Sequence, residues 1–141
     1  MKKIRAFIQK FNRDNHLVFL LAVVFVISRI ILSALGFKFG MDFLNTAWQT
    51  VDTWLLRTDL VRSIWYLHSQ PPFFNLFIGI GLKLFPVHYA VFFEIIFHLL
   101  GLILAVCLYY IAKNLTNNRW LSFWCSLVFV LSPSLLLFEY F

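Results

Sequence analysis

The chain has 141 residues, of which 62% are hydrophobic, 20% aromatic and 13% charged, and its formal net charge is +6. A soluble domain carries about a quarter charged residues, and 18 Phe and 5 Trp side chains cannot all be buried in a domain of this size. The composition excludes an ordinary soluble domain and predicts an all-α integral membrane protein.

The first segment, residues 1–16, is predicted to be a basic cytoplasmic tail. It holds one acid, Asp14, against five basic residues: Lys2, Lys3, Arg5, Lys10 and Arg13. The positive-inside rule keeps such a tail on the cytoplasmic side. We therefore interpret the net positive charge as a topology signal and expect no nucleic-acid partner.

The first membrane span is predicted over residues 17–37. Its 21 residues make about 31 Å of helix, which is enough to cross the hydrocarbon core. The apolar run is longer than the core of a signal peptide, which favours an uncleaved anchor. Arg29 lies deep in this span, where a charged side chain needs a partner.

The connection between the first two spans, residues 38–71, is too long for a turn and has a helical pattern. One predicted helix has an apolar face formed by Leu44, Ala47, Trp48, Val51, Trp54 and Leu55, and its polar face contains Asp42, Asn45, Gln49 and Asp52. Such an amphipathic helix suits a membrane surface. A second short helix is predicted after a cap at Thr58 or Asp59, with Leu60, Ile64 and Leu67 on its buried side. On the predicted topology the whole connection is extracytoplasmic.

The segment YLHSQPPFFNLF, residues 66–77, predicts where the next helix begins. Proline fixes its own φ and disfavours the helical conformation in the residue before it. Pro71 and Pro72 therefore end the preceding helix and open a new one. His68 and Gln70 are expected at this helix start, either as capping groups or as contacts to a substrate.

Three further spans are predicted over 72–86, 89–112 and 120–138. The span over 72–86 is short, but Trp65, Tyr66 and Lys83 can anchor it at the two interfaces. A proline within 120–138, Pro133, is tolerated when neighbours satisfy the freed carbonyl. Glu94 and His98 are four residues apart on the third span, so they share a face and can pair.

The ordered set of segments resembles the N-terminal part of the GT-C superfamily of membrane glycosyltransferases. The matching pieces are FGMDFLNTAWQTVDTWLLRTDLVRSIWYLHSQPPFFNLFIGIGLKLFP and the later LSPSLLLFEYF. The branch that it resembles contains protein mannosyltransferases and the bacterial aminoarabinose and Rgt-like transferases. Members of the superfamily have many more membrane segments, so we expect residues 17–141 to be the N-terminal part of such a domain.

The resemblance implies a reaction at the extracytoplasmic face of a bacterial inner membrane. A sugar passes from a polyprenyl-phosphate donor to a lipid, glycan or protein acceptor. The acid after the first span is the family's candidate general base, and Asp42 occupies that position. Asp52 is the second choice. A carboxylate can take the proton of the acceptor hydroxyl, and a cation or bound metal is expected to stabilise the departing phosphate.

The same resemblance implies substrate contacts in the extracytoplasmic connection. Besides Asp52, these are His68 and Gln70, near the donor or acceptor, and Arg57 and Arg62, near the lipid phosphate. No Cys/His metal spacing and no Gly-rich phosphate loop occur in the sequence, so no cofactor and no metal ligand are predicted.

Each assignment has a structural alternative. Asp42 can be a helix N-cap, and Arg57 and Arg62 can be ordinary surface arginines. The intramembrane charges can be a structural ion pair or a polar seam along the lipid-phosphate pathway. For the whole chain, the alternatives are a small polytopic interaction protein and a transporter subunit, neither of them catalytic.

Overall fold

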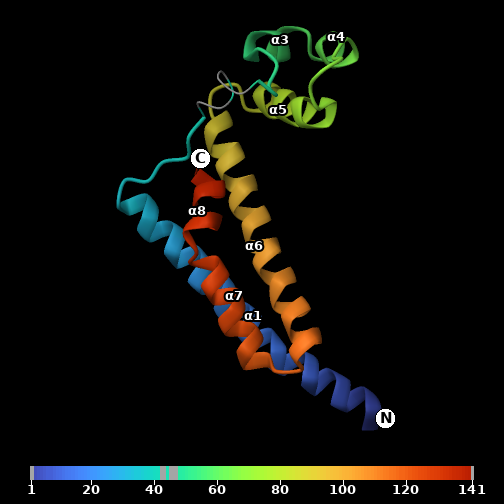
Figure 1. Cartoon of the computed structure of the whole chain (residues 1–141), viewed down its shortest axis with the longest axis vertical. Helices are drawn as coiled ribbons and strands as arrows, with labels where there is room; N and C mark the ends of the chain where they lie inside the picture. Colours follow the sequence, from blue (N-terminus) through green and yellow to red (C-terminus); the bar gives the residue numbers. More distant parts are fainter. Residues whose placement is uncertain (1, 42–43, 45–47, 141) are drawn as a thin grey trace. The chain divides into compact units, whose positions relative to one another are not determined.

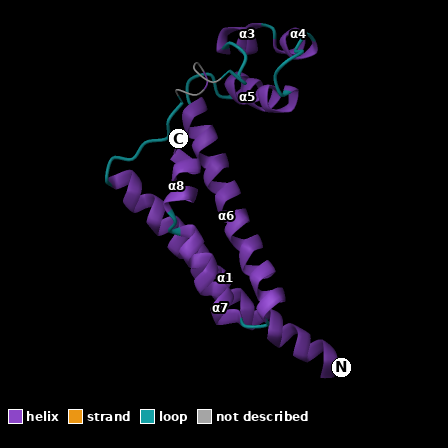
Figure 2. Ribbon diagram, in the orientation of Figure 1, coloured by secondary structure: helices purple, strands orange, loops and turns teal. Residues whose placement is uncertain are grey.

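The computed structural model describes residues 2–41, 44 and 48–140, without the side chains of residues 2–15 and of Phe138. Within this part of the chain all regular structure is helical, as Figures 1 and 2 show. The helices are α1 (Lys2–Ala34), α3 (Thr53–Thr58), α4 (Leu60–Trp65), α5 (Pro72–Leu84), α6 (Tyr89–Thr116), α7 (Arg119–Val130) and α8 (Pro133–Tyr140). The predicted all-α class is confirmed.

The chain divides into two compact units. Unit 1 contains Met1–Lys38 and His98–Glu139, and unit 2 contains Phe39–Phe97 and Tyr140–Phe141. The first turns of α6 therefore belong to unit 2, and the rest of this helix belongs to unit 1.

Helix α1 continues without a break from the basic tail into the apolar segment and ends at Ala34, three residues before the predicted end of the span. Gly36 adopts φ +94°. The Phe37 N–H bonds the Leu32 carbonyl at 3.1 Å and the Gly36 N–H bonds the Ser33 carbonyl at 3.0 Å. This is a Schellman motif, in which a left-handed glycine satisfies the last carbonyls of the helix. The apolar run is thus longer than the helix because Gly36 ends it.

Within the residues that the structure describes, two helices are long and apolar enough to cross a membrane: His16–Ala34 of α1 and Tyr89–Thr116, which is the whole of α6. The most apolar 18-residue stretches of these two helices have mean hydropathies of 2.7 and 2.6. Only 22% and 17% of these stretches are buried inside the protein. A core helix of a soluble protein would be mostly buried. The exposed apolar surface of α1 and α6 therefore suggests a membrane protein.

The expectation of four spans is not confirmed. Helix α5 begins at Pro72, as predicted, but its 13 residues reach about 20 Å, less than the ~30 Å hydrocarbon core. The span predicted over 120–138 is two helices, because α7 ends at Val130 and α8 begins at Pro133. Proline has no N–H to offer to the Phe129 carbonyl. That carbonyl accepts instead from the backbone N–H and the hydroxyl of Ser132, at 3.1 and 2.7 Å.

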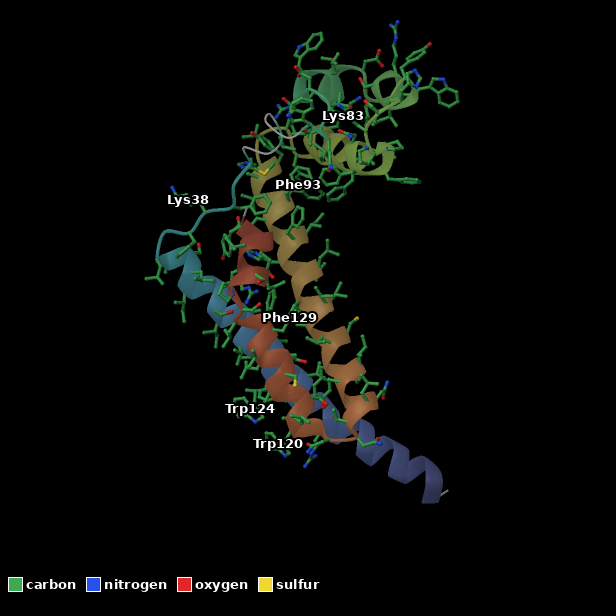
Figure 3. The ribbon with its side chains drawn as sticks, viewed as in Figure 1. Lys38, Lys83, Phe93, Trp120, Trp124 and Phe129 are labelled. Carbon is green, nitrogen blue, oxygen red and sulfur yellow. The ribbon has the colours of Figure 1, made fainter. Side chains whose placement is uncertain are left out.

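Unit 1 is held together by an apolar core to which α1, α6, α7 and α8 all contribute. Helix α1 packs against α7, and both are seen side by side in Figures 1 and 2. Trp120 and Trp124 of α7 are exposed (Figure 3). Phe123, between them in the sequence, is buried. The buried core residues are Leu17, Leu21, Phe25, Ala105, Tyr109, Phe123, Val130 and Leu135.

In the described part of unit 2, the short helices α3 and α4 lie between α1 and α5, and Leu44 is helical as well. The amphipathic helix predicted from Asp42 to Leu55 is interrupted. Residues 48–50 form a turn, 51–52 are not helical, and α3 begins only at Thr53. The predicted apolar face also splits, since Leu44 is buried while Trp48 and Trp54 are exposed. The physical reason is local: Asp52 caps a helix that begins after it.

The second short helix, α4, lies where the sequence predicted it. Asp59 is at the N-cap position, although its side chain makes no capping bond. Leu60 is buried and Ile64 is half-buried against α5. A Cβ at Gly79 of α5 would overlap the Leu60 side chain, so the absence of a side chain at residue 79 lets the two helices approach closely.

The core of unit 2 extends from α5 to the first turns of α6. Phe93 at the start of α6 (Figure 3) is buried. Its ring meets Phe77 of α5 edge-on with centroids 5.4 Å apart. The rings of Phe92 and Phe93 also cover Gly81, where a Cβ would lie 2.8 and 2.6 Å from them. The chain 48–84 is thereby packed on the start of α6.

Candidate functional site

The predicted general base, Asp42, lies outside the described residues, so its role stays a prediction. The neighbouring described residue Leu44 is buried in the core of unit 2. Its carbonyl accepts a hydrogen bond of 3.0 Å from the Thr50 hydroxyl. The chain just after Asp42 is therefore fastened to the segment that leads to Asp52.

Asp52 is exposed and is the N-cap of α3. Its Oδ1 accepts the Trp54 N–H at 2.7 Å, and the Leu56 N–H donates to its backbone carbonyl at 3.1 Å. The cap satisfies a backbone N–H that a helix start otherwise leaves without an intrahelical partner. The carboxylate has a fixed position and is open to solvent, which are two properties that a proton acceptor for a soluble or lipid-linked hydroxyl requires.

The backbone before Asp52 is held by two amide side chains, Gln70 from the bend before α5 and Asn75 from the first turn of α5. Gln70 Nε2 donates to the Trp48 carbonyl at 3.1 Å. Asn75 Nδ2 donates to the Gln49 carbonyl at 2.9 Å, and Asn75 Oδ1 accepts the Val51 N–H at 2.7 Å. We call these contacts the Asn75 clamp. Gln70 was predicted at the helix start, whereas Asn75 was not predicted, although it is a polar residue inside the apolar run after the two prolines.

The two arginines predicted to meet the lipid phosphate have different neighbours. Arg57 Nη1 donates to the Pro86 carbonyl at 3.5 Å, and its guanidinium carbon is 5.1 Å from the centroid of the Tyr89 ring. The guanidinium carbon of Arg62 is 6.0 Å from the Tyr66 ring centroid. Both arginines are exposed. The structure brings Gln70 to the segment before Asp52, but it does not join Arg57 and Arg62 into one contact.

His68 is exposed and lies in the bend that leads to Pro71. Gln70 lies in the same bend, so both residues that were predicted at the helix start lie just before α5. Asn75 Nδ2 makes a second bond here, to the Pro71 carbonyl at 3.0 Å, and so ties the bend to the first turn of α5.

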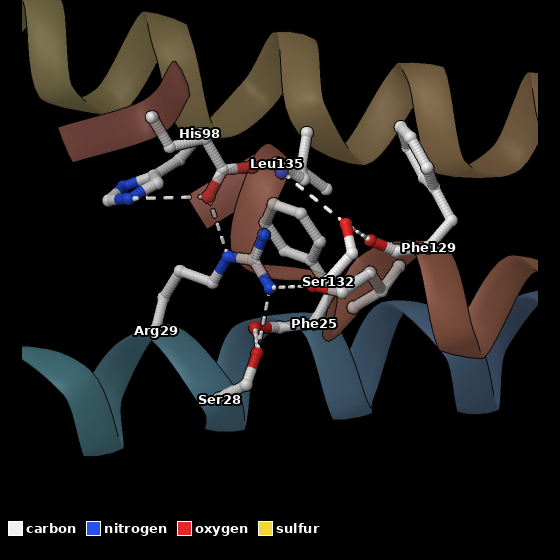
Figure 4. Close-up of polar contacts among 9 residues, drawn as sticks. Phe25, Ser28, Arg29, His98, Phe129, Ser132 and Leu135 are labelled. Atoms are coloured by element: carbon white, nitrogen blue, oxygen red, sulfur yellow. Dashed lines mark hydrogen bonds and ion pairs between the residues drawn. The ribbon is translucent and has the colours of Figure 1, made fainter. Parts of the chain in front are cut away.

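A second polar cluster is buried in unit 1 (Figure 4). Arg29 Nε donates to Glu139 Oε2 at 2.7 Å, with side-chain exposures of 6% and 3%. His98 Nε2 lies 3.9 Å from the same oxygen. The sequence indicated that Arg29 needs a partner but missed Glu139, although LFEYF contains it. The predicted pairing of Glu94 with His98 stays a prediction.

Arg29 also donates a hydrogen bond at the break between α7 and α8. Its Nη1 donates to the Val130 carbonyl at 3.0 Å and to the Ser28 hydroxyl at 2.9 Å. Val130 is the last residue of α7, and the last carbonyls of a helix have no intrahelical partner. One guanidinium therefore satisfies a helix end and neutralises a buried carboxylate. The Phe25 ring centroid lies 3.8 Å from the guanidinium carbon.

Glu139 fits beside α6 because residue 101 has no side chain. A Cβ added at Gly101 would overlap Glu139 Oε1 and would lie 3.4 Å from the Phe25 ring. Gly101 is buried, so this space is filled by the carboxylate. The cluster thus requires residues from α1, α6 and α8, and no local sequence pattern connects them.

Across the described residues, no three His, Cys, Asp or Glu side chains are grouped in a way that could hold a metal ion. Comparison of the chain with protein-family models, with curated proteins and with solved structures gave no match. The chemistry of the site must therefore be argued from its own residues.

Proposed function

We propose that this chain acts in the transfer of a sugar from a polyprenyl-phosphate donor to an acceptor at the extracytoplasmic face of a bacterial inner membrane, with residues 1–16 in the cytoplasm. The observation that carries the proposal is the construction of unit 2. Asp52 is exposed at the start of α3, and the backbone just before it is held by the Asn75 clamp. The helices α3, α4 and α5 of this unit lie in the sequence between two helices that are long and apolar enough to cross a membrane.

The proposed reaction needs a base close to the membrane surface. The acceptor oxygen attacks the anomeric carbon of the sugar, and the bond from that carbon to the phosphate oxygen breaks. The polyprenyl phosphate leaves with the bonding electron pair, and a carboxylate takes the acceptor's proton. Asp42 is the proposed base because of its position after the first span, and Asp52 is the second candidate.

The exposed cations of unit 2 are proposed to meet the donor phosphate. Arg57 and Arg62 carry guanidinium groups, which bind phosphate oxygens well because of their planar set of donors. His68 and Gln70 are proposed to contact the sugar or the acceptor. Since Gln70 already donates to the Trp48 carbonyl, its substrate contact would use its remaining amide atoms.

The surface of unit 2 supports a place at the lipid headgroups. Trp54, Trp65 and Tyr66 are 67%, 80% and 64% exposed, and such amphipathic rings are enriched at membrane interfaces. The start of α6 is part of the same unit. When α6 crosses the membrane, its first turns lie at one membrane surface, and the rest of unit 2 then lies at that surface too.

The test compares sugar transfer by wild type, Asp42→Asn and Asp52→Asn in membranes, with a radiolabelled polyprenyl-phosphate sugar as donor. Asparagine is nearly isosteric with aspartate but cannot take up the proton. We expect Asp42→Asn to lose transfer at unchanged expression, and His68→Ala to lose less. Loss in Asp52→Asn alone would move the base to Asp52, and full transfer by both Asn variants would exclude the proposed mechanism.

The alternative is a transporter subunit or a small interaction protein without catalysis. The buried Arg29–Glu139 pair with His98 beside it is the observation that favours it, because charges within membrane helices often mark transport pathways. The two proposals differ in the carboxylates that matter. The alternative predicts that Glu139→Gln abolishes function while Asp42→Asn and Asp52→Asn are silent.

A further inference from the structure

The side chain of Asn75 is fully buried, with 0% of its surface exposed, although it lies on an otherwise apolar helix. Burying an amide without partners is costly. Asn75 has partners for both ends of its amide: the oxygen accepts the Val51 N–H, and the nitrogen donates to the carbonyls of Gln49 and Pro71. The buried amide of Asn75 therefore forms hydrogen bonds to backbone groups at both of its ends.

The partners of Asn75 are alternate backbone groups of one segment. A carboxamide presents one acceptor and a donor group side by side, and it bonds the carbonyl of residue 49 and the N–H of residue 51 as a neighbouring strand would. Such a contact depends on the backbone of this segment and not on its side chains. Gln70 extends it by one residue, to the Trp48 carbonyl.

We propose that Asn75 is a positioning residue for the site at the start of α3, an inference that rests on the proposed transferase function. By fixing residues 49–51, Asn75 sets the direction in which the chain enters Asp52, the N-cap of α3. Thr50, inside the fixed segment, bonds the Leu44 carbonyl, so the chain after Asp42 is fastened to the same segment. Asn75 itself touches no reacting atom.

The first measurement is hydrogen exchange of the Val51 amide in the purified full chain in detergent micelles. In Asn75→Leu the acceptor of the Val51 N–H is lost. Because the hydrogen bond that protects this amide is lost, we expect it to exchange about tenfold faster, the equivalent of ~1.4 kcal/mol. If Asn75→Leu does not fold, the same exchange measurement is made on Asn75→Asp. It keeps an acceptor for Val51 but turns an oxygen toward the Gln49 and Pro71 carbonyls, and we expect an intermediate increase.

The matched control is Ile78→Val, on the same helix and 1% exposed. It weakens the core of unit 2 by removing one buried carbon but leaves the Asn75 clamp intact. Sugar transfer is then compared between variants of equal stability. We expect Asn75→Leu to lower kcat at least about tenfold with little change in the KM of the donor, and Ile78→Val to keep both constants.

Each outcome decides one step. Unchanged exchange of Val51 in both Asn75 variants would show that the clamp does not hold the segment and would overturn the proposal. Faster exchange with a kcat equal to that of Ile78→Val would reduce Asn75 to a structural residue, which also overturns it. If the Asn75 variants exchange faster but the wild-type protein transfers no sugar, the proposed function is refuted, and with it the positioning role. The hydrogen bonds of the Asn75 clamp would still be established.

Discussion

Removing one member of the buried Arg29–Glu139 pair should destabilise the protein far more than removing both. Both side chains are more than nine-tenths buried, so solvent does not screen the interaction appreciably. Glu139→Gln leaves the guanidinium of Arg29 charged and without its carboxylate. Breaking a buried ion pair in this way costs about 3–5 kcal/mol. Arg29→Met should cost at least as much, because the Val130 carbonyl also loses its donor.

The double variant Arg29→Met/Glu139→Leu should recover most of this loss. It removes the need to desolvate two charges, and replacing a buried pair by apolar residues of similar size is often neutral or stabilising by about 1–4 kcal/mol. The Val130 carbonyl stays without its donor, so we expect a net cost of about 1–2 kcal/mol. The assay is the free energy of unfolding in mixed micelles, followed by circular dichroism, with the exposed Arg62→Met as the control.

Two results would refute this reasoning. Single variants that cost no more than the control, about 0.5 kcal/mol, would show that the pair is solvated or absent. A double variant whose cost equals the sum of the two single costs would show that Arg29 and Glu139 do not interact, because contacting residues are expected to be non-additive.

Three further predictions follow from single positions. Gly101→Ala should cost about 1–3 kcal/mol of unfolding free energy, because its Cβ would overlap Glu139 Oε1; a neutral result would mean that the carboxylate lies elsewhere. Gly36→Val should cost about 1 kcal/mol through its φ of +94° alone, since nothing lies within 4 Å of its Cβ position, and an unchanged stability would argue against the left-handed helix end. A cysteine at Ser69, in a variant without Cys107 and Cys125, should react with a membrane-impermeant reagent from outside the cell, and labelling from the cytoplasmic side alone would reverse the proposed topology.

Local sequence signals predicted three of the helix starts. Pro72 opens α5, Tyr89 opens α6, and Asp59 stands at the N-cap of α4. These helix starts depend on the fixed φ of proline or on polar residues next to an apolar run. Both signals lie within a few residues of the helix start and can be recognised in the sequence.

Features that depend on distant partners were missed. Arg29 and Glu139 are 110 residues apart, and Asn75 bonds backbone groups 24 and 26 residues before it. The predicted helix over 44–55 failed because helical spacing alone does not show that Asp52 caps a later start. Pro133 was expected inside one span, whereas the helix breaks before it, and Arg29 and Ser132 satisfy the last carbonyls of α7.

The measurement that tests the central claim most directly is release of polyprenyl phosphate from a polyprenyl-phosphate sugar by the purified protein in proteoliposomes, with acceptor supplied as a membrane extract. The blank is the double variant Asp42→Asn/Asp52→Asn in the same proteoliposomes. The account predicts acceptor-dependent release by wild type and none above background by the double variant. Equal release by the two proteins, or none by either with donor and acceptor present, would contradict it.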